Sequence, residues 1–240
     1  MTRRAVVVGA SSGIGLELAR GLAAEGYELG LVARRLDLLE KVASELPTRT
    51  WVRTIDVSLS QEAIAGLSAL LRDMDSVDLV VLCAGIGFLN RKLKWEYEEA
   101  TIATNVEGFA ACAGVAWAHF VTRGKGHLVG ISSVAALRGG NQAPAYAASK
   151  AFVANYLEGL AAISHQRKLN ITVTDIRPGF VDTPMTRGQK GMFWVARPEV
   201  AARQILRAIR CRKRVAYVTR RWSIIAAIMR ILPHWLYRKL

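Results

Sequence analysis

The chain has 240 residues, of which 52% are hydrophobic and six are tryptophan. This apolar content is enough for a substantial core, so composition excludes a disordered chain. The formal net charge of +14 would by itself indicate nucleic-acid binding. However, residues 187–240 hold 14 of the 33 basic residues and one of the 19 acidic residues, whereas residues 1–186 are nearly neutral. The charge therefore belongs to the C-terminal segment, and no nucleic-acid partner is predicted for the body of the chain.

Strand-like and helix-like segments alternate from the N-terminus onward. The predicted strands are 5–9, 27–34, 50–57, 77–85, 127–133, 171–179 and 214–218. The predicted helices are 16–26, 36–46, 60–74, 106–122, 145–164 and 198–210. Nearly continuous apolar strands separated by helices predict an α/β fold with a single doubly wound parallel sheet of Rossmann type, covered by helices on both faces. The predicted domain is 1–218, and 219–240 is a basic amphipathic extension rather than a separate domain.

The cysteines and the N-terminus give no sign of secretion. Cys83, Cys112 and Cys211 are an odd number and lack metal-type spacing, so neither a disulfide framework nor a metal site is predicted. The apolar run after the first basic residues is interrupted by Gly and Ser too early for a signal peptide. We expect a cytoplasmic protein with reduced thiols.

The segment GASSGIG, residues 9–15, directly follows the first predicted strand and opens a helix. Glycines allow a sharp turn and let a pyrophosphate approach the helix N-terminus, where free N–H groups favour anions. A glycine turn that only packs strand against helix is the alternative, but this position in an alternating pattern favours dinucleotide binding. The predicted cofactor contacts here are Gly9, Ser11, Ser12, Gly13, Ile14 and Gly15.

The second predicted strand ends in Ala33, Arg34 and Arg35, where an NAD-binding site usually carries a carboxylate for the ribose 2′-hydroxyl. A guanidinium suits a 2′-phosphate, so we expect NADP(H) to be preferred over NAD(H), with the larger role for Arg34. A solvated arginine pair at the start of a helix is the alternative.

Tyr146 and Lys150 are four residues apart and therefore share one helix face. A nearby ammonium stabilises a phenolate and brings tyrosine toward useful acid–base range. Ser133 ends the fifth predicted strand, at the sheet edge where open α/β sheets bind ligands. Its hydroxyl is placed to hold a substrate carbonyl oxygen beside Tyr146. An isolated Tyr–Lys pair of this spacing would more simply be structural.

Taken together, these residues resemble the short-chain dehydrogenase/reductase family. The resemblance runs in order from Gly9 to about Thr183, roughly three quarters of the chain. The matching motifs are GASSGIG, Asp56-Val57, CAG at 83–85, Asn105 in NVEG, ISS at 131–133, YAASK, and RPGFVDTPM.

The resemblance implies a hydride-transfer enzyme with four catalytic residues. Tyr146 would be the general acid in carbonyl reduction, and Ser133 would hydrogen-bond the carbonyl oxygen. Lys150 would bind the nicotinamide ribose and lower the pKa of Tyr146, while Asn105 would position a water in a proton relay through Lys150.

The same resemblance implies the remaining cofactor contacts. Asp56 and Val57 would meet the adenine, and Thr183 the nicotinamide carboxamide. The other implied contacts are Ala84, Gly85, Tyr146, Lys150, Pro178, Gly179 and Val181.

Two positions depart from the family pattern. Val8 stands where Thr often precedes the first glycine, and Cys83 stands where Asn usually precedes Ala-Gly. The usual residues help hold the loop and the central sheet together, so these departures bear on local stability more than on chemistry. We interpret Cys83 as a small buried hydrophobe rather than a nucleophile.

The segment after Thr183 shapes the substrate pocket in this family. Here it contains Met185, Met192, Phe193 and Trp194, which together with Phe88 would line an apolar pocket. Packing of some of these side chains against the sheet is the alternative.

The closing segment is apolar, aromatic and basic. Its apolar part, 222–232, is shorter than the roughly 20 residues that span a bilayer, and Pro233 is expected to end a first helix. We consider three roles for this segment: interfacial contact with an anionic membrane, packing on the domain or across an oligomer, and nucleic-acid binding. The high aliphatic content makes nucleic-acid binding the weakest of the three. Similar tails occur on some bacterial short-chain reductases of lipid-linked or long-chain substrates. The aromatic and basic residues concerned are Trp222, Trp235, Tyr237, Arg220, Arg221, Arg230, Arg238 and Lys239.

The leading hypothesis is an NADP(H)-dependent reductase of a hydrophobic or lipid-linked carbonyl substrate, cytoplasmic and peripheral on the inner face of the membrane. The alternatives are a soluble small-molecule carbonyl reductase with a tail used for assembly, or a non-catalytic NADP-binding regulatory protein. The family resemblance further implies a homo-dimer or homo-tetramer formed through the helices 106–122 and 145–164. No nucleic-acid partner is expected.

Overall fold

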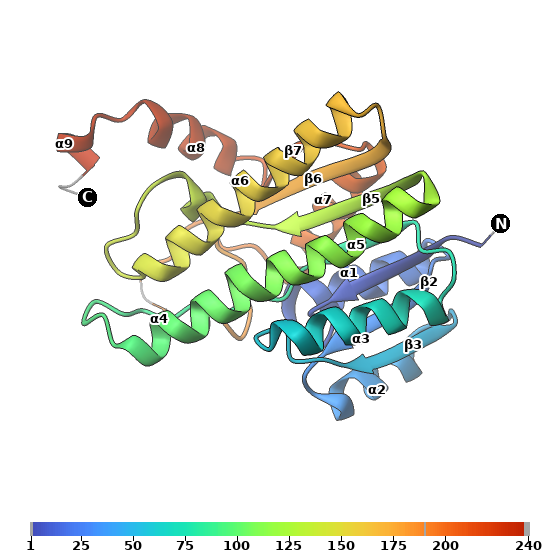
Figure 1. The fold of residues 1–240 in the computed structure, drawn as a ribbon. Helices are drawn as coiled ribbons and strands as arrows, with labels where there is room; N and C mark the ends of the chain where they lie inside the picture. Colours follow the sequence, from blue (N-terminus) through green and yellow to red (C-terminus); the bar gives the residue numbers. More distant parts are fainter. Residues whose placement is uncertain (1, 190, 238–240) are drawn as a thin grey trace.

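A computed structural model describes residues 2–189 and 191–237, and in it seven parallel strands form one sheet in the order β3-β2-β1-β4-β5-β6-β7 (Figure 1). The strands are β1 (Arg4–Val8), β2 (Glu28–Ala33), β3 (Thr50–Thr54), β4 (Leu79–Leu82), β5 (Lys125–Ile131), β6 (Asn170–Pro178) and β7 (Val215–Val218). The main helices are α1 (Gly13–Ala24), α2 (Leu36–Glu45), α3 (Ser60–Asp73), α5 (Phe109–Arg123), α6 (Pro144–Gln166) and α7 (Pro198–Arg210). The predicted strands and helices are present, with ends that differ by a few residues.

Apolar side chains on both faces of the strands explain the layering. In β1, Val6 and Val8 pack with α3, α5 and α6, while Ala5 and Val7 pack with α1, α2 and α7. The sheet is thus sandwiched between two layers of helices (Figure 1). This confirms the doubly wound α/β fold, because strands buried on both faces must be apolar throughout.

The strand order reverses between β1 and β4, and open α/β sheets bind ligands in a crevice outside the carboxyl ends of the strands at such a point. Strand β1 pairs with β2 on one side and β4 on the other, so the connections diverge at this point. The chain leaves β1 at Gly9, whose N–H donates to the Val32 carbonyl at 2.7 Å. The Ala84 N–H, just past β4, donates to the Val8 carbonyl at 2.8 Å.

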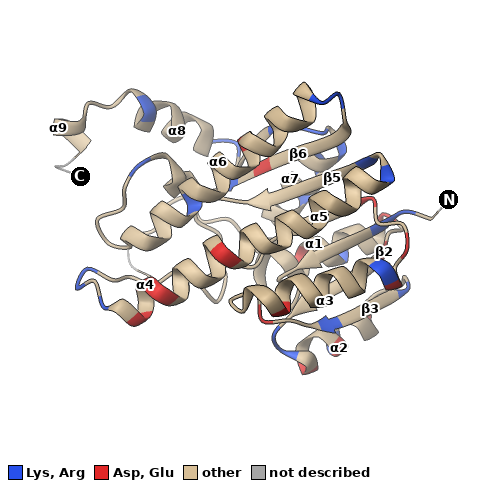
Figure 2. Ribbon diagram, in the orientation of Figure 1, with Lys and Arg blue, Asp and Glu red and all other residues tan. Residues whose placement is uncertain are grey.

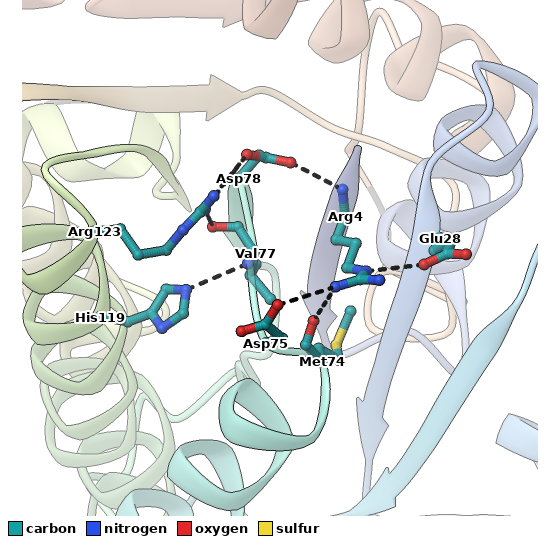
Figure 3. Close-up of polar contacts among 8 residues, drawn as sticks. All are labelled: Arg4, Glu28, Met74, Asp75, Val77, Asp78, His119 and Arg123. Atoms are coloured by element: carbon teal, nitrogen blue, oxygen red, sulfur yellow. Dashed lines mark hydrogen bonds and ion pairs between the residues drawn. The ribbon is translucent and has the colours of Figure 1, made fainter. Parts of the chain in front are cut away.

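The opposite end of the sheet is closed by charged side chains (Figure 3). Arg4 Nε lies 2.9 Å from Glu28 Oε2, and the Arg4 backbone N–H donates to Asp78 Oδ2 at 3.0 Å. Arg123 of α5 lies 3.3 Å from the other Asp78 oxygen. These contacts hold β1, β2, β4 and α5 together, away from the crevice.

Three short helical elements were not predicted. They are α4 (Trp95–Ile102), the π-helical η1 (Ala103–Gly108) and the 3₁₀-helical η2 (Val134–Leu137). The segment WEYEEATI of α4 does not keep its apolar residues to one side, so its sequence lacks the pattern of an amphipathic helix. The widened turn of η1 leads directly into α5.

The tail forms α8 (Trp222–Ile231) and α9 (His234–Tyr237), separated at Pro233 as expected. Arg138, just after η2, donates through Nε to the Met229 carbonyl at 2.8 Å and through Nη2 to the Leu232 carbonyl. The Tyr237 hydroxyl donates to the Gly139 carbonyl at 2.7 Å. The tail is therefore fastened to the segment that follows Ser133. Arg238 and Lys239 lie outside the described residues.

Candidate active site

The first turns of α6 bring Tyr146 and Lys150 to the carboxyl end of β5. Pro144 begins the helix, a position where its missing N–H has no intrahelical partner. Lys150 Nζ lies 5.7 Å from the centre of the Tyr146 ring and donates to the Ile131 carbonyl at 3.0 Å. This bond ties the lysine to the last residue of β5.

Ser133 is buried beside Tyr146 and is held by three elements. Its backbone is extended, and its Oγ accepts the Ala135 N–H at 3.1 Å, which caps η2. The same hydroxyl lies 3.3 Å from the Pro178 carbonyl at the end of β6. Its position therefore depends on β5, η2 and β6 together.

Burial changes both titratable groups of the pair. The pKa of Tyr146 is raised by burial, and a hydrogen bond with Ser133 partly opposes the rise. The pKa of Lys150 is lowered by burial to about 8, against the opposing influence of Cys83 and Asp175. Ser133 thus lowers the Tyr146 pKa in this arrangement, and the lowering by Lys150 that the sequence led us to expect stays a prediction.

Asn105 lies in the π-helical turn η1 and is almost fully buried. Its Oδ1 accepts the Ile86 N–H at 2.9 Å, and its Nδ2 donates to the Ile86 carbonyl at 2.7 Å and to Ser149 Oγ at 3.0 Å. A single-turn widening of this kind is frequent at functional sites. Asn105 joins the segment after β4 to α6.

The segment after β4 approaches the side chains that are predicted to be catalytic through two glycines. A Cβ added to Gly85 would lie 3.1 Å from Lys150 Nζ and 3.2 Å from Asn105 Oδ1. A Cβ added to Gly87 would lie 2.6 Å from Cδ2 of the Tyr146 ring. Gly87 was not identified from the sequence, although the glycine repeat in CAGIG was the available signal.

The glycine turn fits a dinucleotide. Gly9 and Gly13 have φ values of +94° and +57°, and a Cβ on Gly15 would meet the Gly9 carbonyl oxygen at 2.0 Å. Ser12 precedes α1 without a side-chain capping bond, so no capping side chain occupies the N–H groups that open the helix. Ser11 and Ile14 belong to the same turn.

The two arginines after β2 point to different neighbours. Arg35 Nη2 donates to Ser11 Oγ at 3.2 Å, so this guanidinium lies against the glycine turn. Arg34 Nη1 lies 3.8 Å from Asp56 Oδ2, where β3 ends. Val57, next to Asp56, is buried with its carbonyl against Gly108. The residues predicted for the adenosine end therefore gather along one edge.

The turn after β6 runs back to the glycine turn. Pro178 ends β6, and Val181 is buried and bridges to Ala196. A Cβ on Gly13 would lie 3.2 Å from Thr183 Cγ2, so Thr183 borders the start of α1. The sequence-predicted cofactor residues, distant along the chain, thus lie at the same end of the sheet as Tyr146 and Ser133.

Aromatic residues connect this turn to the tail. The Trp222 ring has its centre 5.5 Å from Phe180, 5.0 Å from Phe193 and 6.0 Å from Trp194. The ring also covers Gly179, where an added Cβ would overlap the indole at 1.9 Å. Trp222 is buried, unlike the interfacial position considered for it from the sequence.

Phe193 and Trp194 each pack against Trp222 and keep 47% and 39% of their surfaces exposed, and their lining of a substrate pocket stays a prediction. Phe88, next to Gly87, is 37% exposed and stacks on Tyr97 with ring centres 4.8 Å apart. Met185 is also partly exposed. Partly exposed apolar side chains thus follow both β4 and β6 in the chain.

The two departures from the family pattern are structural. Val8 is buried, and its carbonyl accepts the Cys83 N–H at 2.8 Å. Burial raises the pKa of the Cys83 thiol to about 12, so it stays protonated near neutrality. Nucleophilic chemistry at Cys83 is therefore disfavoured.

Comparisons with known proteins identify the family of the chain. A family model described as short chain dehydrogenase matches residues 3–192. An uncharacterized oxidoreductase of Myxococcus xanthus is 38% identical over 77% of this chain and 74% of its own length. An uncharacterized oxidoreductase of Mycobacterium tuberculosis is 34% identical over 100% of this chain and 98% of its own length.

Solved structures show the same fold. An actinorhodin polyketide ketoreductase variant with NADPH has a TM-score of 0.80 at 27% identity, covering 90% of this chain and 95% of that chain. A short-chain dehydrogenase from Sphingobium yanoikuyae in complex with NADPH has a TM-score of 0.79 at 25% identity, covering 94% and 92%. The family match over most of the chain, joined to this fold, shows that the chain belongs to the short-chain dehydrogenase/reductase family and is an NAD(P)-dependent oxidoreductase.

Proposed function

We propose that the protein is an NADPH-dependent reductase of a ketone or aldehyde carbonyl on a hydrophobic or lipid-linked substrate. The observation that carries the proposal is the meeting of Ser133, Tyr146 and Lys150 at the carboxyl end of β5, beside a turn that fits a dinucleotide. A protein that only bound the cofactor would have no need of this set.

The side chains supply the proton half of the reaction. When bound, NADPH supplies the hydride that reduces the carbonyl carbon. The Tyr146 hydroxyl gives its proton to the carbonyl oxygen, so that the C=O bond becomes a CH–OH group. Ser133 donates a hydrogen bond to the same oxygen. Lys150 keeps a positive charge near Tyr146 and favours the phenolate left after transfer, and Asn105 fixes the loop over the pair.

The preference for NADPH is supported by Arg35 and Arg34. An arginine at the end of the second strand suits a 2′-phosphate of the adenosine ribose, and here one guanidinium lies against Ser11 and the other beside Asp56. Two similar structures contain NADPH. Replacement Arg35→Ala is expected to weaken NADPH binding about tenfold or more, since a charge-assisted contact is lost. NADH binding should change little, and Arg72→Ala on α3 is the matched control.

The hydrophobic substrate class is supported by the partly exposed Phe88, which follows β4, and by the partly exposed Phe193 and Trp194, which follow β6. Turnover of ketones of increasing alkyl length, measured as NADPH consumption, should show kcat/KM rising with chain length because more apolar surface is buried. A preference for short, polar ketones would favour the small-molecule reductase instead.

Removal of the tyrosine hydroxyl tests the reaction itself. Tyr146→Phe should lower kcat by at least about a thousandfold because the general acid is missing, while NADPH binding measured by fluorescence titration stays within about twofold. A Tyr146→Phe enzyme with wild-type turnover would overturn the assignment. Wild-type protein that binds NADPH but reduces no carbonyl would indicate the regulatory alternative.

A further inference from the structure

Helix α8 has an apolar face on each side. Its inner side buries Trp222 and Ala226 against the domain. Its outer side carries Ile224, Ile228 and Ile231, spaced so that they fall on one helix face, with 59%, 47% and 81% of their surfaces exposed. A surface helix normally turns polar residues outward. An exposed row of isoleucines therefore indicates a surface that a lipid membrane or another molecule covers.

A basic groove adjoins the first turn of α8. Its volume is about 990 Å³, and it runs between α7, β7 and the start of α8 as far as Ser223, the residue before Ile224. Among the residues that the structure describes, none that lines this groove is acidic. Its basic lining residues are Arg203, Arg207, Arg210, Lys213, Arg220 and Arg221. Figure 2 likewise shows a basic position and no acidic position on α8.

We propose that the outer face of α8 and this basic groove together bind the surface of an anionic membrane. The isoleucines would enter the boundary between headgroups and acyl chains, and the groove would receive lipid phosphates. The helix would lie flat, because its ten residues reach about 15 Å, half the thickness of a bilayer core. Among the described residues there is no helix with the length and hydropathy of a membrane span.

Charge distinguishes this occupant from a second copy of the chain. Two copies meeting through α8 would each bring the C-terminal segment with its 14 basic residues and one acidic residue, and like charges at close range repel. An anionic bilayer offers apolar depth for the isoleucines and negative charge for the arginines at the same time. The surface does not depend on the reductase chemistry.

Vesicle co-sedimentation of the full chain tests the proposal. Wild-type protein should bind vesicles of phosphatidylcholine with phosphatidylglycerol, bind vesicles of phosphatidylcholine alone less, and lose affinity as salt is raised. The double variant Ile228→Gln with Ile231→Gln should have an affinity for the anionic vesicles that is lower by at least about tenfold. Arg203→Gln with Arg207→Gln should weaken binding and reduce its salt dependence.

Matched controls use the same chemical changes on α2 and α3. Ile64→Gln, at a position 40% exposed, and Lys41→Gln with Arg72→Gln should bind like wild type. Circular dichroism and thermal melting establish that every variant is folded.

Wild-type protein that does not bind anionic vesicles overturns the proposal, as do control variants that lose as much binding as the test variants. A dimer in sedimentation velocity that disappears in the isoleucine variant also overturns it, because the occupant is then a second copy.

Discussion

Tyr146 and Lys150 are one helical turn apart, yet burial moves their pKa values in opposite directions. Taking a charged form out of water is unfavourable, so the phenol holds its proton more strongly and the ammonium holds its proton less strongly. Below a pH of about 8 the lysine remains charged and the tyrosine remains protonated. This combination suits a proton donor for carbonyl reduction.

The rate of reduction should therefore fall on the alkaline side. As the pH rises through about 8, Lys150 loses its proton and can no longer favour the phenolate that Tyr146 leaves behind. We expect kcat/KM for ketone reduction with NADPH to be steady near neutrality and to decline above that value, since this constant reports groups of the free enzyme. A profile that stays level to pH 10 would contradict the role given to Lys150.

Gly87 should be needed for the placement of Tyr146. In Gly87→Ala the new methyl group would lie 2.6 Å from one ring carbon and 3.0 Å from the next, so the ring must move. A displacement of this size is expected to lower kcat by about tenfold to a hundredfold, while NADPH affinity changes little. Gly139→Ala, with no atom within 4 Å of its added Cβ, is the control and should retain full activity.

At the scale of elements, Arg138 makes several of the contacts that attach the tail. Arg138 donates to the carbonyls of Met229 and Leu232 and stacks 5.4 Å above the centre of the Tyr237 ring. In Arg138→Ala these carbonyls lose a charged donor, and amide hydrogens of 229–237 should exchange about tenfold faster. Hydrogen exchange read by mass spectrometry measures this. Arg91→Ala should leave exchange in the tail unchanged, and equal rates in both variants would show that other contacts hold it.

The sequence predicted the strands and long helices because their apolar runs are clear and end at glycine, proline or polar residues. It predicted Ser133, Tyr146 and Lys150 as one site because parallel strands bring their carboxyl ends to one edge. It did not predict α4, whose WEYEEATI lacks a helical pattern. It also left the orientation of α8 open, since apolar residues on all sides make periodicity uninformative about which side packs.

Across the whole molecule, the two ends of the sheet are built differently. The amino ends of the strands are cross-linked by ion pairs around Arg4 and Asp78, while the carboxyl ends carry the glycine turns and the reacting side chains. The contacts of Arg35 with Ser11 and of Gly87 with Tyr146 join residues far apart in the chain. Such contacts depend on the final packing, so no local pattern in the sequence indicates them.

Global stability should fall in mild acid because of His127. This side chain is buried in β5 with Nε2 2.8 Å from Thr174 Oγ1, and burial, aided by the charge of Arg212, lowers its pKa from 6.5 to about 4. Between pH 6.5 and about 4, His127 binds a proton in the unfolded chain but not in the folded chain. The free energy of unfolding therefore decreases as the pH falls, by about 3 kcal/mol when the pH reaches 4. Urea unfolding at several pH values measures the slope.

A His127→Gln variant should show a smaller loss of stability between pH 6.5 and 4, since the amide does not titrate. His165→Gln, at an exposed position near the end of α6, is the matched control and should keep the wild-type slope. Identical slopes in wild type and His127→Gln would assign the acid sensitivity to other groups.

The contact between Trp194 and Trp222 has an optical consequence. Two indoles with centres 6.0 Å apart and planes at 84° couple their electronic transitions, which produces a pair of circular dichroism bands of opposite sign. One indole belongs to the segment beside the crevice and the other to the base of the tail. The band pair therefore reports, without any added label, whether the tail remains seated when cofactor, substrate or vesicles are added.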